Sequence, residues 1–132
     1  MPFSPVVVAL PIADRRRSHD FYRAVLSVDA VGDIGGDGIA EPLQFPLNDG
    51  VRLMLIPSEG FGWVVGSRAV ADGDTSECVV TLFADDEAGV DTLARRAQEA
   101  GGAVVSEPGA QPWAYTATFT DPDGHLWSVM RT

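Results

Sequence analysis

The sequence predicts an α+β fold built from two tandem β-α-β-β-β modules within a single domain over residues 1–132. The same order of apolar runs and amphipathic segments occurs twice, and the opening strands, near Val6 and Val79, lie about 73 residues apart. A tight-turn signal also recurs after about 74 residues, at Asn48-Asp49-Gly50 and at Asp121-Pro122-Asp123-Gly124. We place the first module at about 1–57, a connecting segment at 58–76, and the second module at about 77–132.

In the first module, the continuous valine run within residues 3–10 predicts a buried strand. Asp14 is the expected N-cap of an amphipathic helix over residues 15–27. Three further strands are expected, of which the second is weakened by two prolines. They cover residues 28–34, 39–47 and 51–56.

The connecting segment reads as a long glycine-containing loop over residues 57–75 that also carries aromatic side chains. A loop of this length inside a domain is usually functional or a linker. We expect it to join the modules while Phe61 and Trp63 cover a ligand; the alternative is that these aromatics only pack beneath the loop.

The second module repeats the pattern with a buried strand over residues 78–84, in which Cys78 is expected as a small buried hydrophobe. Asp85 or Asp86 caps a helix that runs to Ala100 and ends at a pair of glycines. The closing strands are expected at residues 103–107, 113–120 and 125–131.

The composition excludes several classes of function. Nineteen acidic residues against nine arginines, with no lysine, give a net charge of −10, which disfavours nucleic acid and anionic membranes as partners. One cysteine allows no intramolecular disulfide, and no apolar run is long enough to cross a membrane. With no signal-peptide pattern at the N-terminus, the expected location is the cytoplasm.

Two motifs resemble the vicinal oxygen chelate superfamily, which includes glyoxalase I, extradiol dioxygenases and the bleomycin and fosfomycin resistance proteins. The opening run from Leu10 to Tyr22 is similar to that family's strand, Asp, spacer, Ser and Phe-Tyr pattern. The run from Asp121 to Trp127 is similar to its closing hairpin. More narrowly, Leu53-Met54-Leu55 with Trp113-Ala114-Tyr115 resembles an uncharacterised bacterial "glyoxalase family" subgroup. The resemblance implies the glyoxalase/bleomycin resistance fold, a cup-shaped mixed sheet, and a homodimer.

In the enzymes of that superfamily the cup holds a divalent metal through His, Gln or Glu side chains. The resemblance maps these positions to Val7, Met54, Val79 and Ser128, none of which is such a ligand. Displaced ligands would have to come from Glu41, Gln44, Glu77 or Cys78, and no two of them fall at the family's spacing. We therefore expect no metal and no cofactor, and whether the protein is an enzyme stays open.

The residues that remain favour a ligand held by apolar and aromatic contacts. Arg52 stands alone in an apolar strand, hydroxyl side chains recur from Tyr115 to Thr120, and several aromatic residues are expected at the mouth of the cup. The ligand-binding candidates are Arg52, Phe61, Trp63, Trp113, Tyr115, Trp127 and Ser128. The predicted function is metal-free binding of an apolar or aromatic small molecule between the modules. The alternatives are a metal-dependent lyase or ring-cleavage dioxygenase with displaced ligands, a metal-free isomerase that uses a Tyr or Glu as acid and base, and a cup filled by its own side chains.

Overall fold

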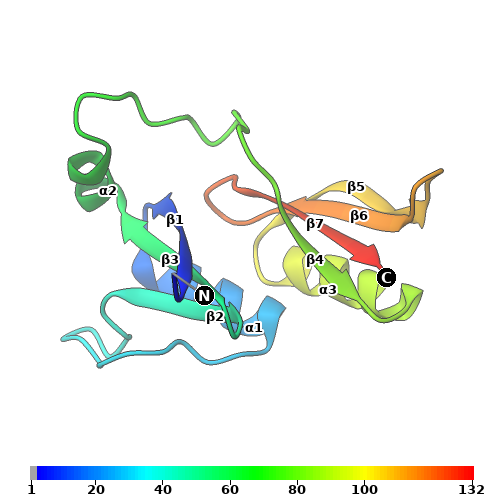
Figure 1. Ribbon diagram of the computed structural model, residues 1–132, viewed down its shortest axis with the longest axis horizontal. Helices are drawn as coiled ribbons and strands as arrows, with labels where there is room; N and C mark the ends of the chain where they lie inside the picture. The colour runs from blue at the N-terminus through cyan, green and yellow to red at the C-terminus, as the bar shows by residue number, and fades with distance from the viewer. Residues whose placement is uncertain (1–2) are drawn as a thin grey trace. The chain divides into compact units, whose positions relative to one another are not determined.

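Three helices and seven strands make up the computed structural model, which describes residues 3–132. The strands form two separate sheets, each within one compact unit (Figure 1). Unit 1 holds the chain up to Arg23 together with Ser27–Val70, and unit 2 holds Ala24–Leu26 together with Ala71–Thr132. The predicted α+β class is confirmed, and both units share the order strand, helix, strand, strand, although only unit 2 has the full predicted β-α-β-β-β order.

Unit 1 is a three-stranded sheet in the order β1-β3-β2, with β1 parallel and β2 antiparallel to β3. Its elements are β1 (Val6–Ile12), α1 (Arg15–Leu26), β2 (Leu43–Asn48), β3 (Val51–Pro57) and α2 (Ser58–Val65). Alternate side chains of the strands are buried, because one face of a sheet carries every second residue. The buried set includes Leu43 and Phe45 of β2 and Leu53 and Leu55 of β3. Tyr22 of α1 packs against Phe45, with 6.0 Å between the ring centroids.

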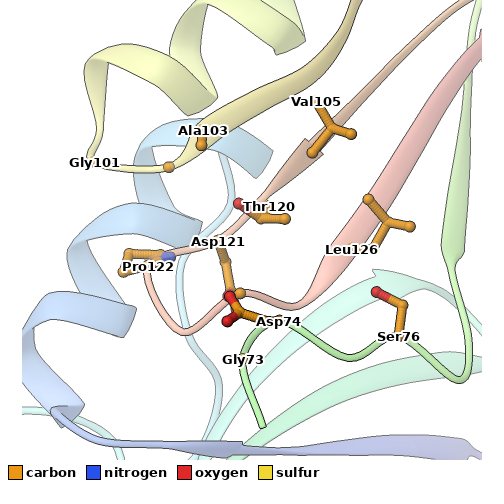
Figure 2. A pocket seen from close by; sticks show the side chains of 12 residues that line it. Gly73, Asp74, Ser76, Gly101, Ala103, Val105, Thr120, Asp121, Pro122 and Leu126 are labelled. Atoms are coloured by element: carbon orange, nitrogen blue, oxygen red, sulfur yellow. The ribbon is translucent and has the colours of Figure 1, made fainter.

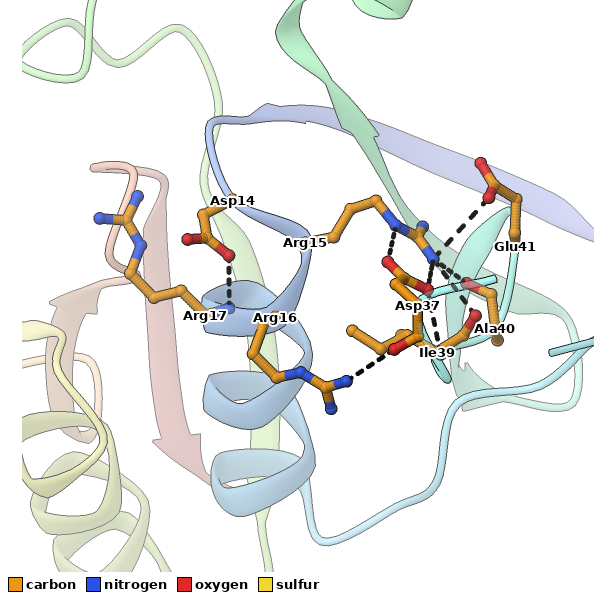
Figure 3. A network of polar contacts seen from close by, with 8 residues as sticks. All are labelled: Asp14, Arg15, Arg16, Arg17, Asp37, Ile39, Ala40 and Glu41. Carbon is orange, nitrogen blue, oxygen red and sulfur yellow. Dashed lines mark hydrogen bonds and ion pairs between the residues drawn. The ribbon is translucent and has the colours of Figure 1, made fainter. Parts of the chain in front are cut away.

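The predicted cap of α1 is confirmed. The Asp14 side chain accepts a hydrogen bond of 3.0 Å from the Arg17 backbone N–H, which satisfies one of the free donors at the helix start. The helix ends at Leu26. The next residue, Ser27, is left-handed (φ 55°), and its N–H donates to the Arg23 carbonyl. Arg15, in the first turn, reaches the loop that follows the helix (Figure 3).

The strand predicted over residues 28–34 is wrong. Only two isolated bridges occur there, Val31 with Gln44 and Ile34 with Ala40, so the sheet of unit 1 has three strands. The next strand begins at Leu43 rather than at residue 39. The Ile39 carbonyl accepts from the Gly35 N–H at 2.8 Å as well as from Arg15, and Ala40 forms only the isolated bridge.

The loop predicted over residues 57–75 contains a helix, α2, which its glycines concealed. The Ser58 hydroxyl donates to the Ile12 carbonyl at 3.1 Å, and α2 contacts β1 and β3. The first strand is also less buried than predicted. It lies at a sheet edge, where Val6 is 55% exposed, because a run of valines shows strand propensity but not which strand neighbours it.

Unit 2 is a four-stranded sheet in the order β4-β7-β6-β5, with β4 parallel to β7 and the other pairs antiparallel. Its elements are β4 (Val80–Ala84), α3 (Glu87–Glu99), β5 (Ala103–Ala110), β6 (Tyr115–Thr120) and β7 (Leu126–Arg131). Helix α3 packs along the sheet (Figure 1) and buries Val90, Ala94 and Ala97. The sheet contributes Ala117, Phe119, Trp127 and Val129 to this core.

Both ends of α3 follow the expected chemistry. Asp86 is the N-cap, and its side chain accepts from the Gly89 N–H at 2.8 Å. After the helix, Gly101 has φ +106° and the Gly102 N–H donates to the Ala97 carbonyl, the arrangement of a glycine-ended helix. The expected burial of Cys78 is wrong, because β4 begins at Val80 and leaves Cys78 exposed before the sheet.

Candidate functional site

One hydrogen bond identifies the face of the unit 2 sheet on which Tyr115 lies. The Tyr115 hydroxyl donates to Oδ1 of Asp91 on α3 at 2.6 Å, so Tyr115 lies on the face that α3 covers. Ala117 and Phe119 share that face, because side chains two apart on a strand point the same way. The Phe119 ring stacks on Trp127, with centroids 6.5 Å apart.

The opposite face of this sheet carries a row of hydroxyl side chains. Thr81 of β4 lies beside Ser128 of β7, Ser128 lies beside Thr118 of β6, and Thr118 lies beside Ser106 of β5. The hydroxyl row thus takes one residue from each strand, about 4.8 Å from the next. Among residues 3–132 none of these four hydroxyls has a protein hydrogen-bond partner, unlike Thr116, which donates to the Val129 carbonyl at 2.9 Å.

Apolar side chains flank the hydroxyl row on this face. Phe83 lies beside Met130 on one side, and Thr120 lies beside Leu126 on the other. Phe83 is 65% exposed, and Met130 and Leu126 are partly exposed. The face therefore offers neutral hydrogen-bonding groups, with Phe83 and Met130 as apolar neighbours on one side and Leu126 on the other.

The corresponding face of unit 1 has different chemistry. Leu53 and Leu55 of β3 are buried, so Arg52 and Met54 lie on the other face of that sheet. Arg52 is exposed and lies between Val7 of β1 and Pro46 of β2 in the pairing register. This face is apolar apart from Arg52 and Gln44, the β2 neighbour of Met54.

A family model matches most of the chain. The model of the Glyoxalase/Bleomycin resistance protein/Dioxygenase superfamily matches residues 5–129. The chain belongs to this superfamily. The family resemblance and the glyoxalase/bleomycin resistance fold, both expected from the two motifs, are confirmed. No curated protein matches the chain.

Several solved structures share the fold over nearly the whole chain. A hypothetical protein from S. aureus, SA1046, has 25% identity and a TM-score of 0.83, covering 98% of this chain and 93% of that one. TnmS3, an antibiotic binding protein from Streptomyces sp. CB03234, has 28% identity and a TM-score of 0.66, covering 99% and 98%. A glyoxalase-related enzyme from Fulvimarina pelagi, at 22% identity and a TM-score of 0.81, covers 96% and 86% and shares the fold.

The metal that the superfamily implies does not fit the residues present. In register, Val7 lies beside Arg52 rather than Met54, and Ser128 lies beside Thr81 rather than Val79, which precedes β4. Valine and arginine are not metal ligands, and neutral hydroxyls alone do not make a transition-metal site. Within residues 3–132 no group of three or more His, Cys, Asp or Glu side chains is placed to hold a metal ion. The absence of a metal in the working protein stays a prediction.

The predicted ligand-binding residues lie on several elements and, within unit 2, on both faces of the sheet. Trp127 is fully buried and Tyr115 is bonded to Asp91, both on the α3 face, whereas Ser128 lies on the hydroxyl-row face. Trp113 is 68% exposed, just before β6. The remaining three, Arg52 on β3 and Phe61 and Trp63 on α2, belong to unit 1. Their role in binding stays a prediction.

The hydroxyl row was only partly visible in the sequence. The alternation in β6 predicts hydroxyls on one face, and the prediction is wrong for Tyr115, which lies on the other face. Ser106 sits between register shifts in β5, so no spacing along the chain predicts that it faces Thr118. Because side chains alternate between the two faces of a strand, the pairing of Thr118 with Ser128 across the closing hairpin is the part of the row that the sequence indicates.

Proposed function

We propose that this protein binds a small molecule without a metal and that the hydroxyl row of unit 2 is part of the binding surface. The observation that carries the proposal is the row itself, in which Thr81, Ser128, Thr118 and Ser106 lie side by side. Ser128 is the position at which the superfamily's enzymes, by resemblance, carry a metal ligand. A neutral hydroxyl there can donate and accept hydrogen bonds but supplies no charged ligand.

The chemistry of this face defines the ligand. Hydroxyls without a protein partner suit carbonyl, ether or hydroxyl groups, each net hydrogen bond contributing about 1 kcal/mol. The apolar side chains of Phe83, Met130 and Leu126 suit a ligand whose main part is apolar or aromatic. TnmS3, described as an antibiotic binding protein, supports a binding role for a chain of this kind. The expected placement of the ligand between the two modules stays a prediction.

Three further expectations accompany this proposal. By resemblance to the superfamily we propose a homodimer, to be checked by light scattering. A bacterial origin and a cytoplasmic location stay predictions. The structure adds that no helix within residues 3–132 is both long and apolar enough to span a bilayer.

The test is calorimetric titration of the full chain with aromatic metabolites and cationic glycopeptide drugs. For any compound that binds, Thr118→Val, which removes a hydroxyl at nearly constant volume, is expected to weaken binding about fivefold. Thr92→Val on α3 is the matched control, because Thr92 belongs to the helix and not to the sheet face. Equal loss in both variants, or no binding across the panel, would count against the proposal.

The alternative function, a metal-dependent lyase or ring-cleavage dioxygenase with displaced ligands, predicts a different result. Elemental analysis of the purified protein would then find stoichiometric Zn, Ni, Mn or Fe, and chelation would abolish turnover. That result would overturn the metal-free proposal directly.

A further inference from the structure

Unit 2 contains a pocket of about 500 Å³ at the turn end of its sheet, within the range of small-molecule sites. Figure 2 shows its three walls. One wall is the strap, defined as residues 71–77, which enters the pocket at Gly73, Asp74 and Ser76. The second is the start of β5 after α3, and the third is the β6–β7 turn with the strand ends beside it.

The strap and the turn meet through their backbones. A Cβ added to Gly73 would lie 2.8 Å from the Asp123 carbonyl oxygen, and one added to Gly124 would lie 2.9 Å from the Gly73 Cα. The turn is held from within, since Asp121 Oδ1 accepts from the N–H groups of Asp123 at 3.0 Å and of His125 at 2.9 Å. These contacts indicate a preformed pocket rather than a gap between loose segments.

The charged side chains that line the pocket are two carboxylates, and no arginine or histidine belongs to the lining. Asp121, at 3% exposure, already accepts hydrogen bonds within the turn, so Asp74 on the exposed strap is the carboxylate that a ligand can reach. Gly101 and Gly102, directly after α3, also line it, so the carbonyl end of the helix lies at the pocket. That end carries partial negative charge from the aligned peptide dipoles. A cation is favoured here and an anion is disfavoured.

The remaining lining suits an apolar body with a polar end. Val105 is 60% exposed, and together with Leu126 and Pro122 it gives the pocket an apolar side. The Thr120 and Ser76 hydroxyls add neutral acceptors for N–H groups. We infer that this pocket binds a small organic cation, a primary ammonium group on an apolar or aromatic body, with Asp74 as the partner of the ammonium.

This inference does not depend on the proposed function. Three residues of the hydroxyl row lie further along β5, β6 and β7, and Thr81 lies on β4. None of the four lines the pocket, although Thr120 and Leu126 border both sites. If Asp74→Asn does not weaken binding of the amine, the inference about the pocket fails and the proposal about the hydroxyl row stands. If Thr118→Val has no effect on ligand binding, the proposal about the row fails and the inference about the pocket stands.

The experiment uses phenethylamine as the probe and follows the backbone amides of the ¹⁵N-labelled full chain by NMR. The expected shifts concentrate on the amides of Gly73, Gly101, Gly102 and Gly124. The neutral analogue 2-phenylethanol and the anion phenylacetate are expected to bind at least fivefold more weakly than the amine, because each lacks the ammonium charge.

The decisive pair of variants is Asp74→Asn and Asp72→Asn. Both remove one negative charge from the strap, but only Asp74 lines the pocket. Asp74→Asn is expected to weaken phenethylamine binding about fivefold, and Asp72→Asn less than twofold. Equal effects of the two variants, shifts scattered over the chain, or equal binding of the alcohol and the amine would overturn the inference.

Discussion

Arg15 and Asp37 form a two-bond pair that links the start of α1 to the loop after it. Arg15 Nε donates to Asp37 Oδ2 at 2.8 Å, and Arg15 Nη2 donates to Asp37 Oδ1 at 3.1 Å (Figure 3). The same Nη2 reaches the carbonyls of Ile39 at 3.2 Å and Ala40 at 3.0 Å. The planar guanidinium matches this fork of acceptors, so Arg15 helps to hold the loop, together with backbone hydrogen bonds such as that from the Glu41 N–H to the Asp33 carbonyl at 2.8 Å.

Arg15→Lys is expected to loosen residues 33–41, because an ammonium keeps the charge but cannot make the two-bond fork. Amide hydrogen exchange in that segment should accelerate several-fold, with little change in unit 2. The matched control is Arg23→Lys, since Arg23 makes a single exposed contact with Asp29 at 3.0 Å. Equal acceleration in the two variants would show that the fork does not hold the loop.

Asp37 gives the pair a dependence on pH. The hydrogen bonds from Arg15 and then from the Ile39 N–H lower the pKa of Asp37 from 3.8 to about 2. Because the folded pKa is depressed, the stabilisation is complete above pH 3.8 and is lost as the pH falls from there towards 2. An NMR titration of the Asp37 carboxyl carbon checks this, and Arg15→Lys should move the midpoint upward. A midpoint at 3.8 in the wild type would contradict the pairing.

The structure of this loop could not be predicted from the sequence. Residues 28–34 and 39–47 look like strands, because they contain β-branched and aromatic residues at strand-like spacing. Arg15, more than 20 residues away, donates to the Ile39 and Ala40 carbonyls, and no local pattern reveals that contact. The caps at Asp14 and Asp86 were predictable, because a cap depends on a side chain and a backbone amide only three residues apart.

The candidate site was likewise predictable only in part. Ser128 and Thr118 were visible as polar residues in apolar strands, and their motifs placed them in a closing hairpin. Their alignment with Thr81 and Ser106 depends on strand register and on an irregular β5. The pocket depends on the path of the strap, where the close approach of Gly73 to Gly124 is a long-range backbone contact with no sequence signature.

The Tyr115 phenol is expected to ionise at a higher pH than an ordinary tyrosine. The hydrogen bond to Asp91, with burial, raises the pKa of Tyr115 from 10.0 to about 12. Since the neutral phenol is the bonded form, its contribution is complete below pH 10.0 and is lost as the pH rises towards 12. NMR of ¹³C-labelled tyrosine gives the midpoint, and Asp91→Asn should return it towards 10.0. An unchanged midpoint in that variant would assign the shift to burial alone.

Trp127 is expected to contribute strongly to the stability of unit 2. Its side chain is fully buried against Phe119, so Trp127→Ala should lower the free energy of unfolding by about 3–5 kcal/mol. Trp113→Ala removes the same side chain from a site that is 68% exposed, and its cost should stay within about 0.5 kcal/mol. Urea unfolding of both variants checks the contrast, and similar midpoints would contradict the burial of Trp127.

Gly124 should tolerate no side chain. Its φ is +92°, and an added Cβ would collide with the Gly73 carbonyl oxygen, so Gly124→Ala combines backbone strain with a clash. The left-handed conformation alone costs about 1–2 kcal/mol for a residue with a Cβ, and moving the strap adds to that. Urea unfolding should therefore show a loss of at least this size, with amide shifts at Gly73 as the strap moves away.

Gly36→Ala is the control for that substitution, because an added Cβ there meets nothing within 4 Å. With no clash to relieve, it should be neutral or stabilise by about 0.4–1 kcal/mol through the unfolded state. If Gly124→Ala cost no more than Gly36→Ala, the strap would not be fixed against the turn. The pocket beside Asp74 would then lack its preformed wall, and phenethylamine would have to order the strap as it binds, which would appear as slower amide exchange at Gly73 on addition of the amine.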